Sequence, residues 1–155
     1  MATGATISHG GNRAFYRPST DRIQMPPFEA FKDAESYYAV LAHETTHWTG
    51  HASRLPRDFG GTRFGSEGYA MEELVAELGA AFLCADLDLA LEPREDHASY
   101  IAHWLDVLKH DNRAIFTAAG QAQCAAEFLN RLQSAVTSTA ILQVIEGDAS
   151  LAPPS

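Results

Sequence analysis

The chain has 155 residues, of which 46% are hydrophobic, and a formal net charge of −9 at pH 7. This length and composition are typical of one globular domain that buries its own core. No apolar run reaches the length of a membrane span, and the N-terminal MATGATISHGG has neither the basic start nor the apolar core of a secretory signal. We therefore expect no membrane association and a cytoplasmic location, where the two cysteines, Cys84 and Cys124, would stay free.

The charge also argues against nucleic-acid binding. Phosphate contacts need clustered lysine and arginine side chains. The 11 basic residues are scattered along the chain, apart from a loose group at Arg54, Arg57 and Arg63. We expect no nucleic-acid binding by this domain alone.

The first third of the chain predicts a small sheet. Three short extended runs, at residues 5–8, 14–17 and 22–25, are separated by two segments with good turn chemistry, HGGN and PSTD. Short loops between short strands predict an antiparallel meander.

The remainder predicts about four helices, so the fold class is α+β. Asp33 can cap a first helix that reaches about residues 47–50, and Ser66 can cap a second whose apolar residues follow the helical repeat. A third helix fits residues 96–110, and a fourth, rich in alanine, begins after Asp111 or Asn112 and reaches about Gln133. We divide the chain into a domain of residues 1–135 and a C-terminal extension of residues 136–155, which ends in a frayed tail.

The first helix carries the strongest motif, LAHETTHWTGH at residues 41–51. On a helix, His43 and His47 project from one face, one turn apart, and both imidazoles can reach one Zn²⁺ at about 2.0–2.1 Å. Glu44 lies beside the metal rather than on it, where a carboxylate can take and return a proton. The HExxH spacing is the signature of zinc peptidases. A helix that merely carries solvated histidines is the alternative, but its apolar neighbours make unpaired histidines costly.

A third protein ligand is expected in the second helix, where MEELVAELGAAFL offers Glu72, Glu73 and Glu77. Helical phase does not separate Glu72 from Glu73. Glu73 and Glu77 share a face one turn apart, so Glu73 can bind the metal while Glu77 orients a ligating histidine. On this hypothesis Glu73 is the ligand, Glu77 its supporting carboxylate, and Glu72 has no role at the metal.

Several segments resemble one known family: HGGNRAFYRPSTDRIQMP, YYAVLAHETTHWTGH, SRL, EELVAELGAAFL, HASYIAHWLDVLKHDNRAIFTAA and AQCAAEFL. Over roughly residues 5–132 the chain is similar to the C-terminal metallopeptidase domain of ArdC-type antirestriction proteins, which also occurs in plasmid primase-associated and phage polyvalent proteins. The resemblance implies a zincin-like α+β fold, with the HExxH on His43, Glu44 and His47 and an acidic ligand in EELVAE. Full ArdC-type proteins carry a preceding domain that binds single-stranded DNA; the sequence begins where the metallopeptidase domain would start, so DNA binding is not carried over.

The resemblance predicts a zinc-dependent peptidase acting on a protein or peptide substrate, with a host restriction-system protein as a candidate, in plasmid or phage establishment. The alternative is a non-hydrolytic, metal-stapled module that binds a protein. Glu44 favours catalysis, because a purely structural site needs no base.

Zincins often hold substrate along an edge strand and stabilise the oxyanion with a tyrosine or histidine. We expect residues 22–25 to be that edge strand, with a purely structural strand as the alternative. Tyr100, His97 and His103 are the candidate substrate or oxyanion donors, or else packing residues. The sequence leaves open whether Arg54 contacts substrate or forms a structural ion pair. It also predicts that His51 lies past the helix end and does not bind metal.

Overall fold

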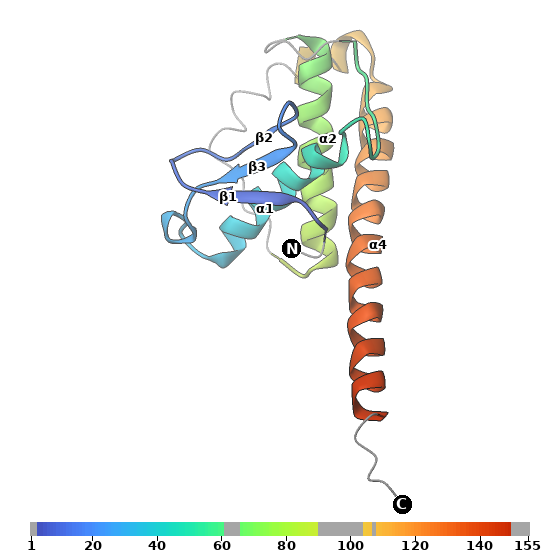
Figure 1. The fold of residues 1–155 in the computed structure, drawn as a ribbon. Coiled ribbons are helices and arrows are strands. Elements are labelled where there is room, and N and C mark those ends of the chain that lie inside the picture. The colour runs from blue at the N-terminus through green and yellow to red at the C-terminus, as the bar shows by residue number, and fades with distance from the viewer. Residues whose placement is uncertain (1–2, 61–65, 90–103, 107, 150–155) are drawn as a thin grey trace, which may run out of the picture.

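The computed structural model describes residues 3–60, 66–89, 104–106 and 108–149 (Figure 1). A three-stranded sheet is followed by a short 3-10 helix, η1 (Phe28–Ala30), and by long α-helices. The strands and long helices are β1 (Thr6–His9), β2 (Phe15–Arg17), β3 (Arg22–Met25), α1 (Ala34–Thr49), α2 (Glu67–Asp86) and α4 (Ala114–Ala149). The predicted α+β class and zincin-like architecture are confirmed.

The sheet is mixed, so the predicted antiparallel meander is wrong in its pairing although each strand lies within a residue of its expected place. The strand order is β1-β3-β2, with β3 antiparallel to β2 and parallel to β1. β3 takes the centre because it carries the two fully buried side chains of the sheet, Ile23 and Met25. The loop from β1 to β2 crosses the end of β3, where the Gly10 amide donates to the Met25 carbonyl at 2.9 Å. Gly11 makes this crossing possible, since its φ of 63° is strained for other residues.

This order also corrects the predicted edge strand. Residues 22–25 form the central strand β3, and β1 and β2 are the edges of the sheet. Contacts between segments distant in sequence decide which strands pair. The alternation of buried and exposed residues within one strand does not reveal those contacts.

The first two helices begin where their capping residues predict. The Asp33 carboxylate accepts from the Ser36 amide at 2.8 Å at the start of α1. Ser66 Oγ accepts from the Tyr69 amide at 3.2 Å at the start of α2. Each cap satisfies an amide that the first helical turn leaves without an internal partner. The metal motif therefore lies in the second half of a helix whose start is fixed.

The sheet packs on α1, and α1 packs in turn on α2 and α4 (Figure 1). One core cluster joins Ile23 and Met25 of β3 to Leu41 and Trp48 of α1 and to Leu129 of α4. A second cluster lies between α2 and α4, where small side chains let the two helices approach; its alanines on α4 are Ala114, Ala118 and Ala122. This packing fixes α1 against α2, the two helices that carry the predicted metal residues.

α1 and α2 are in tight contact at Gly79. A methyl group built there would lie 2.5 Å from Thr46 Cγ2 and 2.8 Å from Thr46 Oγ1. Thr46 is itself fully buried and directly precedes His47. The lack of a side chain at Gly79 thus brings α2 close enough for its glutamates to reach the histidines of α1.

Two predicted helices differ from expectation or fall partly outside the described residues. Residues 104–106 and 108–110 are helical, as predicted, and the rest of the predicted 96–110 helix is not described. α4 continues to Ala149, well past the predicted end at Gln133, and passes the proposed boundary at residue 135 without a break (Figure 1). Among the described helices, none has the length and apolarity needed to cross a membrane.

Candidate metal centre

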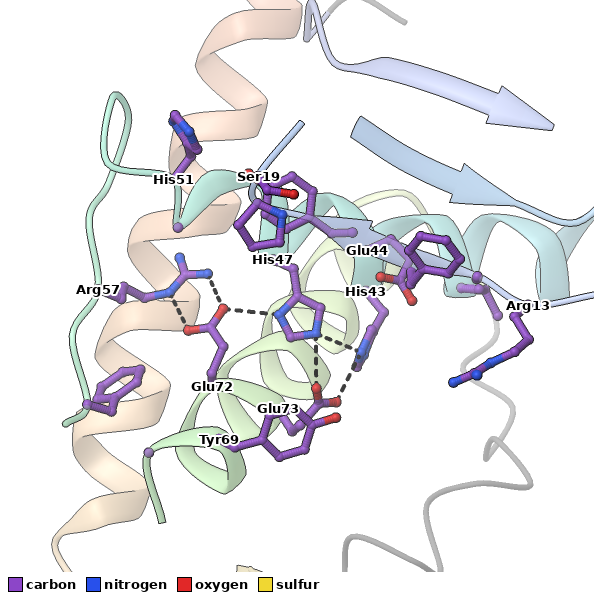
Figure 2. Close-up of a pocket in the computed structure, with 18 of the residues that line it drawn as sticks. Arg13, Ser19, His43, Glu44, His47, His51, Arg57, Tyr69, Glu72 and Glu73 are labelled. Atoms are coloured by element: carbon purple, nitrogen blue, oxygen red, sulfur yellow. Dashed lines mark hydrogen bonds and ion pairs between the residues drawn. The ribbon is translucent and has the colours of Figure 1, made fainter. Parts of the chain in front are cut away.

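Three side chains from two helices bring metal-binding atoms together. His43 and His47 lie one turn apart on α1, and their Nε2 atoms are 3.2 Å apart. Glu73 of α2 faces both: one carboxylate oxygen is 3.6 Å from His43 Nε2 and the other is 3.5 Å from His47 Nε2. In the described part of the chain, these three form the one group of histidine, cysteine and acidic side chains able to hold a metal ion (Figure 2).

The far nitrogen of each imidazole faces a different carboxylate. His47 Nδ1 donates to Glu72 Oε1 at 3.1 Å. His43 Nδ1 lies 3.1 Å from Glu77 Oε1, in an ion-pair contact that is not aligned as a hydrogen bond. A carboxylate only accepts, so each contact favours a proton on Nδ1 and a lone pair on Nε2. At 3.2 Å the two Nε2 atoms can share a proton or together face a metal cation.

The spacing of the candidate ligand atoms also fits zinc. Ligands placed tetrahedrally at about 2.0–2.1 Å from a zinc ion lie about 3.3–3.4 Å from one another. The two Nε2 atoms are 3.2 Å apart, and each faces a different Glu73 oxygen, at 3.6 Å from His43 Nε2 and 3.5 Å from His47 Nε2. One ligand atom from each of the three residues lies within 4.8 Å of the other two. Two imidazoles and one carboxylate, with a fourth position left open, are the donor set of catalytic zinc sites.

The electrostatics of the centre favour a positive charge. Burial opposes the charged form of His47, but the carboxylates of Glu72 and Glu73 outweigh it and raise the pKa of His47 to about 10. Burial likewise works to raise the pKa of Glu73, yet its bonds to His43 and His47 hold that pKa well below its usual range. The same field that retains a proton here attracts a divalent cation.

The centre opens into a large pocket of about 1010 Å³. Its walls come from the edge strand β2, from α1, from the loop after α1 and from α2; Phe15, Tyr16, Tyr69 and Arg13 are among the lining residues. Glu44 is almost fully buried against the protein and also lines this pocket, beside the histidines (Figure 2). No hydrogen bond or ion pair engages its carboxylate among the described residues. The group that the sequence assigns to proton transfer is therefore uncommitted.

The loop after α1 is held by two arginines with separate partners. Arg54 donates to the Trp48 carbonyl at 2.8 Å, stacks over the Trp48 ring at 3.8 Å and pairs with Asp21. Arg57 instead donates to both oxygens of Glu72, at 2.9 and 2.7 Å. The sequence left two roles open for Arg54, substrate contact or a structural ion pair. The structure shows the ion pair, with Asp21.

The structure groups most of the predicted site residues and adds others. His51 lines the pocket and, as predicted, lies past the end of α1, where its Nδ1 is 2.8 Å from Ser53 Oγ. Glu72, which was expected to have no role at the metal, contacts the candidate ligand His47 directly. The three candidate donors on the third predicted helix, Tyr100, His97 and His103, lie outside the described residues.

Sequence reasoning missed Arg57 as well as the role of Glu72. Helical spacing shows which residues share a face, but it does not identify a partner delivered by a loop. The only available signal was the presence of three glutamates, Glu72, Glu73 and Glu77, in the interior of the apolar helix α2, where each needs a partner.

The mixed sheet packs on long helices. The HExxH motif lies on α1, and Glu73 of α2 faces its two histidines. This combination defines a zincin-like metallopeptidase domain. The chain belongs to that family, whose profile, described as zincin-like metallopeptidase, matches residues 1–121.

The resemblance to ArdC-type proteins is confirmed by solved structures. The Mn(II)-bound crystal structure of the antirestriction ArdC protein from the R388 plasmid is 47% identical, with a TM-score of 0.78, over 85% of this chain and 49% of that one. Its metal-free structure is 48% identical, with a TM-score of 0.76, over 86% of this chain and 48% of that one. Three findings support the expected metal cofactor: the zincin-like family, the Mn(II)-bound structure of the ArdC protein, and the group of His43, His47 and Glu73 in this chain.

Two curated relatives extend the comparison. The uncharacterized protein y4eC of Sinorhizobium fredii (strain NBRC 101917 / NGR234) is 56% identical over 131 residues, which are 84% of this chain and 42% of that protein. DNA primase TraC of Escherichia coli is 45% identical over 146 residues, which are 90% of this chain and 14% of that protein. The chain therefore spans less than half the length of each of these relatives.

Proposed function

We propose that this chain is a zinc-dependent peptidase domain that hydrolyses a protein substrate. One observation carries the proposal: His43, His47 and Glu73 converge on one point, with an uncommitted Glu44 beside them in the wall of a large pocket. A structural zinc site needs neither the open fourth position nor the adjacent carboxylate.

His43, His47 and Glu73 would hold the ion. A zinc ion bound there supplies Lewis acidity, which makes water a nucleophile near neutral pH and polarises a peptide carbonyl. Glu77 and Glu72 would keep the two imidazoles turned with Nε2 toward the ion.

Glu44 is the proposed general base and then general acid. Its carboxylate takes a proton from the attacking water and delivers it to the amine that leaves when the peptide bond breaks. The position one residue after His43 turns it about 100° around α1, so it flanks the ion rather than binding it. The outer edge of β2, whose Phe15 and Tyr16 line the pocket, offers backbone groups for an extended substrate segment.

The relatives suggest the setting in which such a peptidase would act. One is an antirestriction protein from a plasmid and another a DNA primase. We infer that the domain serves plasmid or phage establishment in the cytoplasm of a bacterial host. A protein of the host restriction system is the candidate substrate, and the acidic balance of the chain argues against a nucleic-acid partner.

Peptide profiling by mass spectrometry tests this function. The zinc-loaded chain is incubated with a library of peptides from a bacterial proteome, beside Glu44→Gln and the matched control Glu35→Gln. Glu35 lies in the first turn of the same helix and is exposed, so its variant should cleave as the wild type does. Cleavage that Glu44→Gln abolishes, while it still binds zinc, is the expected result.

Equal cleavage by Glu44→Gln and the wild type would refute the assigned role. A complete lack of cleavage, combined with protection of incoming plasmid DNA that survives Glu44→Gln but not His43→Ala, would instead favour the non-hydrolytic, metal-stapled module.

A further inference from the structure

Arg57, in the loop between α1 and α2, makes four hydrogen bonds to groups of these two helices. Only 2% of its side chain is exposed. It donates to Thr49 Oγ1 at 2.8 Å and to the Thr46 carbonyl at 2.9 Å, both near the C-terminal end of α1. It also holds Glu72 of α2 through two bonds, from Nε to Oε2 at 2.9 Å and from Nη2 to Oε1 at 2.7 Å. One guanidinium therefore joins the loop, α1 and α2.

Glu72 transmits this contact to the metal centre. Its Oε1 accepts from Arg57 Nη2 and, at 3.1 Å, from His47 Nδ1 (Figure 2). A carboxylate with both oxygens fixed by a guanidinium has one orientation in which to meet the imidazole.

We propose that Arg57 is a positioning residue for the metal site, acting through Glu72 to fix the ring orientation and tautomer of His47. The inference rests on the proposed function, since it requires that His47 bind metal through Nε2. It makes the loop a functional part of the centre: Arg57 supplies the outermost link of a chain that runs through Glu72 to His47.

The two histidines are supported differently, and this gives Arg57 its importance. Both supporting carboxylates lie on α2, but they differ in exposure. Glu77, behind His43, has 14% of its side chain exposed, whereas Glu72, behind His47, has 27% exposed. Without Arg57, Glu72 could turn toward the solvent of the pocket, and His47 would lose the acceptor that fixes its tautomer.

Lysine could not replace this arginine. The guanidinium makes four directed bonds here, including a bidentate pair, whereas an ammonium is a point charge with three donors. Gly50 shows how closely the planar group is accommodated, since a methyl group built on Gly50 would lie 2.6 Å from Arg57 Nη2.

Arg54 provides a matched control in the same loop. It is also largely buried, with 11% of its side chain exposed, and it also bonds a carbonyl of α1 and an aspartate, Asp21. However, its contacts within the described part of the chain include neither Glu72 nor a candidate metal ligand. Loosening the loop at Arg54 should therefore cost folding stability without changing the metal site.

The test compares Arg57→Lys, Arg54→Lys and Glu72→Gln with the full wild-type chain. Zinc affinity is measured by competition with a chelator, and folding is checked by circular dichroism. Arg57→Lys should weaken zinc binding by about 10-fold, the lower end of the usual effect of losing a partner behind a metal ligand. Arg54→Lys should bind zinc as the wild type does. Adding Arg57→Lys to Glu72→Gln should cause little further loss, because both changes break one chain of contacts.

Nitrogen-15 spectra of the zinc-loaded proteins give a second readout. In the wild type, the His47 ring should carry its proton on Nδ1, and in Arg57→Lys this signal should broaden or divide between two forms. Unchanged zinc affinity and an unchanged His47 spectrum in Arg57→Lys would overturn this inference alone. An equal loss of affinity in Arg54→Lys would also overturn it, by showing a general loosening of the loop. No zinc binding by the wild type would overturn the proposed function as well.

Discussion

A single methyl group at Gly79 tests the contact that brings α2 against the metal helix. Its Cβ would lie 2.5 Å from Thr46 Cγ2 and 2.8 Å from Thr46 Oγ1, well inside van der Waals contact. Thr46 has no exposed surface and its hydroxyl is bound to the Ala42 carbonyl at 2.9 Å, so it has little freedom to move aside. Gly79→Ala should therefore separate the two helices locally.

The expected change in the free energy of unfolding is estimated by comparison with a second glycine-to-alanine substitution, Gly120→Ala. Gly120 lies in α4 with nothing within 4 Å of an added Cβ, so Gly120→Ala should stabilise the chain by about 1 kcal/mol through helix propensity. Gly79→Ala has the same propensity gain but adds overpacking of about 1–3 kcal/mol. The free energy of unfolding of Gly79→Ala should therefore fall below that of Gly120→Ala by about 1–3 kcal/mol.

Urea unfolding of the metal-free proteins, followed by circular dichroism, measures this difference without the linked effect of bound metal. Repeating the Gly79 change in a Thr46→Ala background removes the two closest atoms, and the penalty should largely disappear. If Gly79→Ala and Gly120→Ala stabilise the chain equally, the proposed close approach of α1 and α2 is refuted.

Three further predictions follow from the site and the charges. Glu73→Ala should lose most of the bound zinc, whereas Glu77→Ala should weaken binding by only about 10–100-fold; metal analysis showing full zinc in Glu73→Ala would contradict the ligand assignment. At physiological salt this chain should bind single-stranded DNA weakly or not at all, given its net charge of −9; a sub-micromolar affinity by fluorescence anisotropy would refute this. The bond from Arg54 holds the pKa of Asp21 at about 2 instead of 3.8, so the stability it contributes is present above pH 4 and lost as the pH falls toward 2; acid titration should show this loss in the wild type and not in Asp21→Asn.

The elements that the sequence predicted well are those with local causes. Asp33 and Ser66 cap helices through amides three residues away, and the HExxH spacing follows from the rise and turn of one helix. That Glu73 and Glu77 both face His43 likewise needs only the periodicity of α2. These features can be read from short windows because the interacting groups lie within one or two turns.

The features that escaped prediction depend on contacts between distant segments. β3 was expected at the edge, and its central place follows from packing on α1 and from a loop that crosses its end. The partners of Glu72 are His47 on another helix and Arg57, 15 residues earlier in a loop without periodicity. The end of α4 was misplaced because no glycine or proline follows Gln133 until Gly147, so nothing local stops the helix.

The most direct test of the central claim is an anomalous difference map at the zinc absorption edge, from crystals of the zinc-loaded chain. The account predicts one peak per chain, bonded to His43 Nε2, His47 Nε2 and a carboxylate oxygen of Glu73, with Glu44 beside it but not bonded. The absence of a peak at this position, or a peak bonded to Glu72 or Glu77 in place of Glu73, would contradict it.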